Sequence, residues 1–112
     1  MKATTRCCGG QFSPEWLERV AEVLRLLAHP QRLCIVELLD RAGEAPVHTI
    51  TDALGLRQAV VSQHLNAMRR IGLVAARRRG KEVWYTIADQ RSVKVLRCIA
   101  GGQAEKAEKE VA

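Results

Sequence analysis

Large aromatic side chains are scarce in this chain of 112 residues, which holds two Trp, one Tyr and one Phe. A core with so few rings depends on aliphatic packing, and a chain of this length forms one small domain that often gains stability by dimerising. Long apolar runs are also missing: no stretch approaches the roughly 20 apolar residues of a spanning helix. The N-terminus lacks the apolar centre of a secretory signal. We therefore expect no membrane attachment and a cytoplasmic location.

Sequence signals of catalysis are missing as well. There is no Gly-rich phosphate loop, no paired-carboxylate site and no Cys–His–acid arrangement, so the sequence does not predict an enzyme. The four cysteines are few for a disulfide framework. In a reducing compartment they indicate thiol or metal chemistry instead.

Acidic residues are absent from the whole segment 57–81, which carries seven Arg or Lys. The net charge of the chain is +6, so the basic excess is concentrated in this segment and the remainder is close to neutral. A charge run is often only a solvated helix face. However, ordinary surface helices mix signs to gain i,i+4 pairs, and this segment does not. With a pI near 9.6, it favours a polyanionic partner, either nucleic acid or an acidic membrane surface.

The spacing of apolar residues changes halfway along the basic segment. Apolar residues recur at helical spacing over 58–71, which predicts a helix with one buried face. After Gly72 the pattern becomes strand-like on both sides of Gly80-Lys81, which predicts a hairpin over 73–87. A polar-faced helix followed by a basic-tipped hairpin suits a DNA duplex, because the helix fits the major groove and the hairpin tip reaches phosphates. The polar face of the helix comprises Gln58, Ser62, Asn66, Arg69 and Arg70.

The remaining segments predict a mainly α protein with a small β-hairpin, an α+β fold in the order of a winged helix-turn-helix. Residues 1–13 form a flexible arm, 14–100 one DNA-binding and dimerisation domain, and 101–112 a polar tail. Further helices are predicted over 14–28, 30–41 and 47–54 and from about 89, with a loop at 43–46. Gly55 is expected to end the third helix in a left-handed conformation. The first helix is apolar on two faces, which predicts contact with its own core and with a second subunit.

Three stretches resemble the ArsR/SmtB family of bacterial repressors: LAHPQRLCIVELL (27–39), TDALGLRQAVVSQHLNAMRRIGLV (51–74) and VWYTI (83–87). The resemblance implies a homodimer built on the first and last helices, whose two recognition helices enter successive major grooves of a near-palindromic operator. It also implies a repressor acting at the bacterial nucleoid. Such repressors leave DNA when a metal ion, a metalloid or a reactive sulfur species alters the dimer.

The recognition helix matches the family motif in part. Members usually begin it with Ser-Gln-Ser, where this chain has Arg57, Gln58 and Ala59. Gln58, Ser62 and Gln63 match the motif, and Gln can pair with adenine through two atoms. The departure at Arg57 predicts a stronger phosphate contribution and a shifted base preference. On this hypothesis the DNA-binding set also includes Asn66 and the backbone clamps Arg69, Arg70, Arg77, Arg78, Arg79 and Lys81.

The cysteines are the candidate sensors. Sulfur- and redox-sensing relatives carry one cysteine in each of the helices that hold Cys34 and Cys98, although the register differs here. Adjacent Cys7 and Cys8 suit thiophilic As(III) or Sb(III), with Cys34 or Cys98 as a third thiolate. The alternative is that Cys34 and Cys98 are small core residues and the Cys7-Cys8 pair is incidental.

A familiar metal site is not predicted, and no cofactor is required. Arsenic-sensing relatives have a Cys-x-Cys pair where this chain has Pro46-Val47-His48. In the last helix Asp89 is in register with the zinc sensors, but Arg91 replaces the next ligand. His29 is expected to make a local hydrogen bond and His64 to be a partly buried packing residue.

Two alternatives to a cysteine-controlled repressor stay open at this point. One is a winged-helix module that contacts protein or RNA, for which binding to duplex DNA would be weak and insensitive to salt. The other is a DNA-binding regulator without a cysteine sensor.

Overall fold

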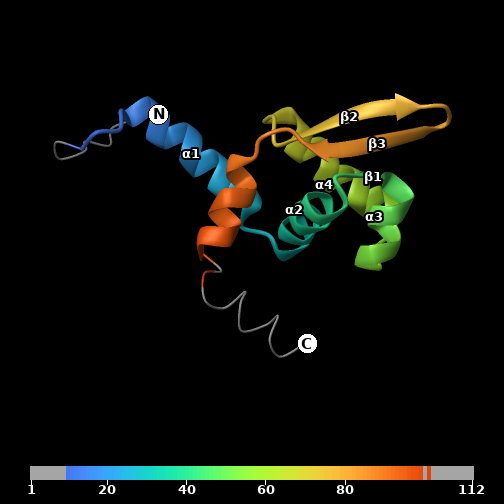
Figure 1. The fold of residues 1–112 in the computed structure, drawn as a ribbon. Helices are drawn as coiled ribbons and strands as arrows, with labels where there is room; N and C mark the ends of the chain where they lie inside the picture. The colour runs from blue at the N-terminus through green and yellow to red at the C-terminus, as the bar shows by residue number, and fades with distance from the viewer. Residues whose placement is uncertain (1–9, 100, 102–112) are drawn as a thin grey trace.

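The computed structural model describes residues 10–99 and 101, so residues 1–9 of the predicted arm, residue 100 and residues 102–112 of the predicted tail lie outside the described residues. The described residues form a winged helix-turn-helix, in which helices pack against a small antiparallel sheet (Figure 1). The predicted helices over 14–28, 30–41, 47–54 and 58–71 and the hairpin are confirmed to within one residue at their ends. The elements are α1 (Pro14–Leu27), α2 (Pro30–Ala42), β1 (Glu44–Pro46), α3 (Val47–Leu54), α4 (Gln58–Arg70), β2 (Val74–Arg79), β3 (Glu82–Ile87) and a C-terminal helix over 91–99.

Local capping explains where the first two helices begin. The Oγ of Ser13 accepts a hydrogen bond from the backbone N–H of Trp16 at 3.1 Å, and Pro14 occupies the first helical position, where it has no N–H to leave unpaired. At the start of α2 the Nδ1 of His29 accepts from the N–H of Gln31 at 3.3 Å, so the predicted local role of His29 is confirmed. Only Ala28 and His29 separate α1 from α2.

The turn between α3 and α4 depends on one glycine. Gly55 has a φ of +67° and donates its N–H to the carbonyl of Thr51 at 2.9 Å, as predicted for a left-handed helix end. A side chain at this position would strain the backbone, since L-residues rarely adopt positive φ. The turn sets the angle at which α4 leaves α3.

The sheet has one strand more than the sequence predicts. Residues 43–46 are predicted as a loop, but β1 (Glu44–Pro46) pairs antiparallel with β3, and the strand order is β1-β3-β2. The prediction failed because this strand is only three residues long and exists through pairing with a distant segment. Pro46 is tolerated at the end of β1 because proline lacks a backbone N–H, and an edge strand has a partner strand on one side only. The hairpin β2–β3, with the Gly80-Lys81 turn, is called the wing below.

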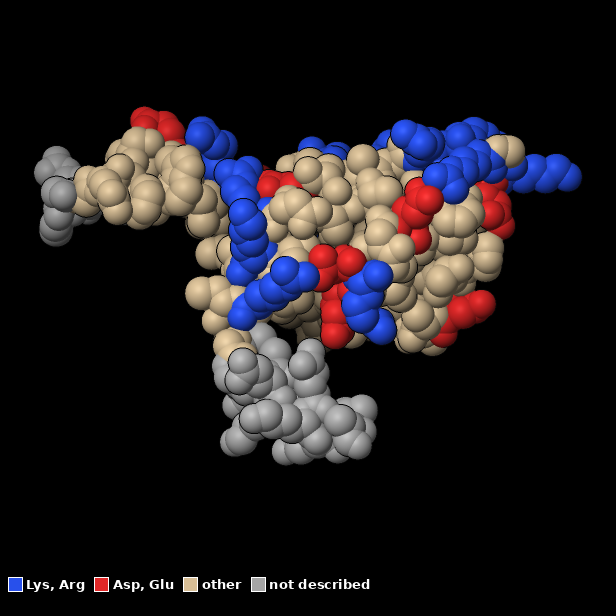
Figure 2. All heavy atoms as spheres, viewed as in Figure 1, with Lys and Arg blue, Asp and Glu red and all other residues tan. Residues whose placement is uncertain are grey.

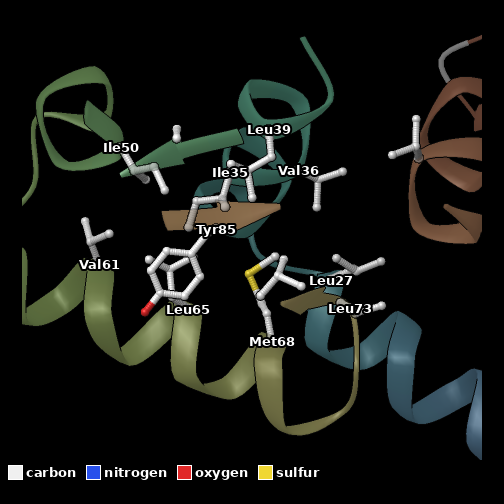
Figure 3. Close-up of a cluster of buried hydrophobic side chains, with 13 residues drawn as sticks. Leu27, Ile35, Val36, Leu39, Ile50, Val61, Leu65, Met68, Leu73 and Tyr85 are labelled. Atoms are coloured by element: carbon white, nitrogen blue, oxygen red, sulfur yellow. The ribbon is translucent and has the colours of Figure 1, made fainter. Parts of the chain in front are cut away.

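A single cluster of aliphatic side chains holds these elements together (Figure 3). α2, α3 and α4 each direct residues into it, and Tyr85 from β3 and Leu27 from α1 belong to the same cluster. The members from α2, α3 and α4 are at most 1% exposed, and burying each such side chain contributes about 1.5–3 kcal/mol. They are Ile35, Val36, Leu39, Ile50, Val61, Leu65 and Met68.

α1 is much less buried than the other helices. It extends away from the body, with the C-terminal helix beside its C-terminal end (Figure 1), and only Leu27 of its residues is buried. Leu24 on α1 and Ile99 on the C-terminal helix are 44% and 76% exposed. In the described part of the chain, no helix has the length and apolar character needed to cross a membrane.

Candidate nucleic-acid interface

The two faces of α4 differ as the sequence predicts. Val61, Leu65 and Met68 are completely buried, and they fix the helix on the core. The opposite side is open to solvent, apart from Ser62, which is half-buried. The exposed residues of the predicted set on this helix and its N-cap are Arg57, Gln58, Gln63, Asn66, Arg69 and Arg70. This face therefore presents amide donors and acceptors together with cations on one rigid helix.

The wing carries the second group of basic residues. Arg77, Arg78, Arg79 and Lys81 are all exposed, and Figure 2 shows Lys and Arg side chains gathered along the edge of the molecule over the wing. In the strand register Arg77 lies opposite Trp84 and Arg78 opposite Val83. Because paired residues share a face and successive residues alternate, Arg77 and Arg79 lie on one face of the wing and Arg78 on the other.

Arg79 differs from its neighbours because its side chain is already engaged. Its Nη2 donates to the Oε1 of Glu44 at 2.6 Å, and its guanidinium carbon lies 4.5 Å from the centroid of the Trp84 ring. Neither Glu44 nor Trp84 was singled out from the sequence. Their roles depend on the pairing of β1 with β3, which no local sequence pattern indicates.

A partly buried polar cluster lies between α1, α2 and α4. The His64 ring is 7% exposed, accepts from the Nε of Arg32 at 3.0 Å and pairs through Nε2 with the Oε1 of Gln31 at 2.8 Å. Burial lowers the pKa of His64 below its ordinary value, and the nearby His29 and Arg32 lower it further. His64 was predicted to be a packing residue. The structure also gives it two side-chain hydrogen bonds, and Arg32 was not singled out from the sequence.

The other candidate ligands for a metal are paired locally. His48 lies 3.1 Å from the carboxylate of Glu82, and Asp89 accepts from both the backbone and the guanidinium of Arg91. The hydrogen bond from the Arg91 side chain lowers the pKa of Asp89. Among the described residues, no group of three or more His, Cys, Asp or Glu side chains is arranged to bind a metal ion.

Cys34 and Cys98 are both exposed free thiols. The alternative that they are small core residues is therefore wrong. Cys34 lies on the outer side of α2, because Ile35 and Val36 occupy the buried side, and Cys98 lies near the end of the C-terminal helix. Cys7 and Cys8 lie outside the described residues.

A helix-turn-helix whose second helix is polar on its open face, followed by a basic wing, defines the chain as a winged helix-turn-helix domain. Comparisons with known proteins agree. The profile for bacterial regulatory proteins of the arsR family matches residues 29–76. The HTH-type transcriptional repressor SmtB of Mycobacterium tuberculosis is 40% identical over 82 residues, which are 73% of this chain and 60% of that protein.

A second comparison matches nearly a whole solved domain. The solution structure of the homodimeric winged helix-turn-helix DNA-binding domain of a Mycobacterium bovis protein has a TM-score of 0.72 and 33% identity, and the match covers 91% of this chain and 95% of that one. An HTH-type transcriptional regulator of Methanocaldococcus jannaschii is 34% identical over 76% of this chain and 96% of its own length. The chain belongs to the ArsR family. It spans about 60% of the length of the SmtB repressor that it matches.

Proposed function

We propose that the protein is an ArsR-type transcriptional repressor that binds a near-palindromic DNA duplex as a homodimer in the bacterial cytoplasm. The observation that carries the proposal is the division of α4: its buried side is apolar apart from His64, and its open side continues into the cations of the wing. Amide side chains on such a helix can contact base edges in the major groove, while arginines neutralise phosphates. The similarity to the SmtB repressor supports the same function.

In the proposed complex the residues divide by their chemistry. Gln58, Gln63 and Asn66 contact bases, because amides can pair with adenine through two atoms. Arg57 contacts the sugar-phosphate backbone at the N-terminus of α4, where the helix dipole also favours an anion, and Ser62 contacts the backbone about one turn farther along. The cations that hold phosphates farther out are Arg69, Arg70, Arg77, Arg78 and Lys81.

The proposed dimer uses α1 and the C-terminal helix. A groove of about 400 Å³ lies between them, and its lining includes Trp16, Val20, Leu24 and Val95. Leu24 and Val95 both line this groove and are 44% and 37% exposed. Exposed aliphatic side chains gathered on one surface are typical of a protein–protein interface. A second copy that covers this surface would bury them and would place two α4 helices on the same side of the dimer.

Binding to a selected duplex tests this function. The wild-type protein is used to select sequences from a random duplex library, and its affinity for the selected duplex is measured as salt is varied. A repressor of this kind should lose affinity steeply, with log K falling by about 0.9 per phosphate neutralised for each unit of log salt. Weak, sequence-independent binding with little salt dependence would instead indicate the protein- or RNA-contact module.

The dimer is tested separately by sedimentation. Leu24→Glu should give a monomer with weak DNA binding, since a charge cannot be buried in an apolar interface without a partner. Leu24→Ala, which removes apolar area but adds no charge, should weaken the dimer less. If Leu24→Glu stays dimeric, another surface forms the interface.

We further propose that cysteine chemistry releases the protein from DNA. Exposure of Cys34 and Cys98 supports this, because a thiol must be reached by its reagent. In the sulfur hypothesis the thiolates attack a polysulfide and break its S–S bonds, so the thiol pair is oxidised by two electrons and a sulfur bridge joins the cysteines. The polysulfide is reduced, and two hydrosulfide ions leave with the two thiol protons. A direct disulfide would require Cα atoms within about 7 Å, in one subunit or across the dimer. In the metalloid hypothesis Cys7 and Cys8 bind As(III) or Sb(III) with one further thiolate.

The two signals are distinguished by intact mass and free-thiol count after anaerobic treatment with arsenite or with inorganic polysulfide, while DNA release is followed in the same samples. A retained metalloid that disappears in Cys7→Ser supports the vicinal pair. A bridged Cys34–Cys98 product with DNA release supports the sulfur switch. If neither reagent gives an adduct or release, the protein is a DNA-binding regulator without a cysteine sensor.

A further inference from the structure

Arg32, in the first turn of α2, bonds to both of the helices that flank it in space. Its Nη1 donates to the carbonyl oxygen of Leu26 near the end of α1 at 3.2 Å. Its Nε donates to the Nδ1 of His64, in the middle of α4, at 3.0 Å. One side chain thus connects the helix proposed for the dimer with the helix proposed for DNA recognition.

The hydrogen bonds determine the protonation state of His64. Arginine has donors only, so the Nδ1 of His64 must carry a lone pair and its proton must lie on Nε2. Nε2 then donates to the Oε1 of Gln31 at 2.8 Å. A protonated ring would direct an N–H at the N–H of Arg32 and would place two positive charges side by side. The neutral ring alone completes the chain of contacts.

These polar contacts restrict α4 in a way that its apolar contacts do not. Leu65 and Met68 bury α4 on the core, but apolar contacts are non-directional and permit small rotations of a helix. Hydrogen bonds weaken steeply with misalignment, so His64 fixes both the rotation and the height of α4. His64 is adjacent to exposed Gln63, so a rotation at His64 would displace the amide of Gln63 as well.

We propose that Arg32 and His64 are positioning residues for DNA binding: the chain of contacts from Leu26 through Arg32 and His64 to Gln31 fixes α4 relative to α1, and DNA binding requires the neutral ring of His64. The inference rests on the proposed function. In this proposal Arg32 and His64 do not touch DNA, but they control the orientation of the α4 residues that do.

Acidity is the natural probe of this arrangement. Two groups act on His64 through their charges: His29, the N-cap of α2, and Arg32 in α2. The ring of His29 meets the ring of His64 edge-on, with centroids 4.6 Å apart. α1 contributes only the neutral carbonyl of Leu26, which accepts from Arg32. Burial, His29 and Arg32 lower the pKa of His64, so the neutral ring is favoured at pH 7 and acid is needed to protonate it. Protonation should therefore weaken DNA binding, although added positive charge elsewhere strengthens it.

The experiment measures affinity of the full chain for the selected duplex from about pH 8 to about pH 5.5, a range that spans the ordinary histidine pKa. The wild type should lose about tenfold in affinity at the acid end, a coupling typical of one polar network. His64→Gln keeps an acceptor and a donor but does not titrate. It should bind within about threefold of the wild type at neutral pH and show no acid loss. His64→Phe should bind weakly at every pH with an unchanged salt slope, because its phosphate contacts are intact.

His48→Gln is the matched control, because His48 is an exposed histidine paired with Glu82. It should retain the acid loss of the wild type. Unfolding by urea and sedimentation of each variant show whether it is folded and dimeric under the binding conditions. If His64→Phe does not fold, the comparison of His64→Gln with His48→Gln decides the matter.

The proposal is overturned if His64→Phe binds like the wild type, if His64→Gln keeps the acid loss, or if His48→Gln removes it. It is also overturned if nitrogen NMR of the His64 ring shows the proton on Nδ1. A wild type that selects no duplex would instead remove the proposed function, and this inference with it.

Discussion

Arg79 reaches across the central strand of the sheet to Glu44, with 2.6 Å between its Nη2 and the Oε1 of the carboxylate. The two residues belong to the edge strands β2 and β1, and the Trp84 ring of β3 lies beneath the guanidinium. The contact ties the wing to the segment that precedes α3. Arg79 thereby acts within the fold as well as contributing to surface charge.

This contact distinguishes Arg79 from the other wing arginines in DNA binding. Arg77→Ala should reduce the salt slope by about 0.9, as expected for one lost phosphate contact. Arg79→Ala should leave the slope nearly unchanged, because we expect its guanidinium to remain with Glu44 and Trp84. Titrations of a selected duplex at several salt concentrations measure both slopes. An equal loss of slope in the two variants would place Arg79 with the phosphate contacts.

Gln63 and Arg78 should differ in the kind of binding that they control. Gln63→Ala should relax base preference at one operator position by about 1–3 kcal/mol. Arg78→Ala should weaken matched and mismatched duplexes alike. The measurement is a set of affinities for the selected duplex and its single-base variants. Equal effects of both changes across that set would contradict the division between a base-contacting helix and a phosphate-contacting wing.

Neighbouring residues on α4 should separate stability from binding. Leu65 is completely buried, so Leu65→Ala should lower the free energy of unfolding by about 2–5 kcal/mol through lost burial and a cavity. Asn66 is exposed, so Asn66→Ala should change stability by less than about 0.5 kcal/mol while it weakens DNA binding. Urea denaturation, combined with duplex titration, measures both quantities. The assignment of the two faces fails if Asn66→Ala proves as destabilising as Leu65→Ala.

The Asp89–Arg91 pair should contribute to the acid sensitivity of the fold. The hydrogen bond from Arg91 lowers the pKa of Asp89 in the folded state. Its stabilising effect is therefore present above the ordinary carboxyl pKa of about 3.9 and is lost as the pH falls through the lower folded value. Asp89→Asn should make stability less dependent on pH in that range, as followed by urea denaturation at a series of pH values.

Asp52→Asn provides the reference for that series, since Asp52 is exposed and forms no ion pair with a described residue. It should show the same loss of stability with acid as the wild type. Indistinguishable curves for Asp89→Asn and the wild type would show that the pair is equally formed in the unfolded chain.

Much of this fold is predictable because its signals are local. Helical spacing of apolar residues, Ser13-Pro14 at a helix start and Gly55 at a helix end each act within one or two turns of chain. β1 was missed because its three residues become a strand only through pairing with β3. Exposure of the two cysteines was likewise not predictable, since the boundary of a buried helix face depends on what packs against it. For the same reason the sequence identified the exposed face of α4 but not the Arg32–His64 contact, which joins residues 32 positions apart.

The third strand has a further consequence for the geometry of binding. A free hairpin could swing to follow a groove, but this wing shares hydrogen bonds with β1, which leads directly into α3 and the recognition helix. The distance from α4 to the wing tip is therefore nearly fixed. In the proposed complex, the spacing between the base contacts of α4 and the phosphate contacts of the wing would then be fixed as well. We expect the affinity of the protein to depend on helical twist, which titration of operator-bearing plasmid topoisomers would measure; equal affinity for relaxed and underwound plasmids would show that the wing adjusts.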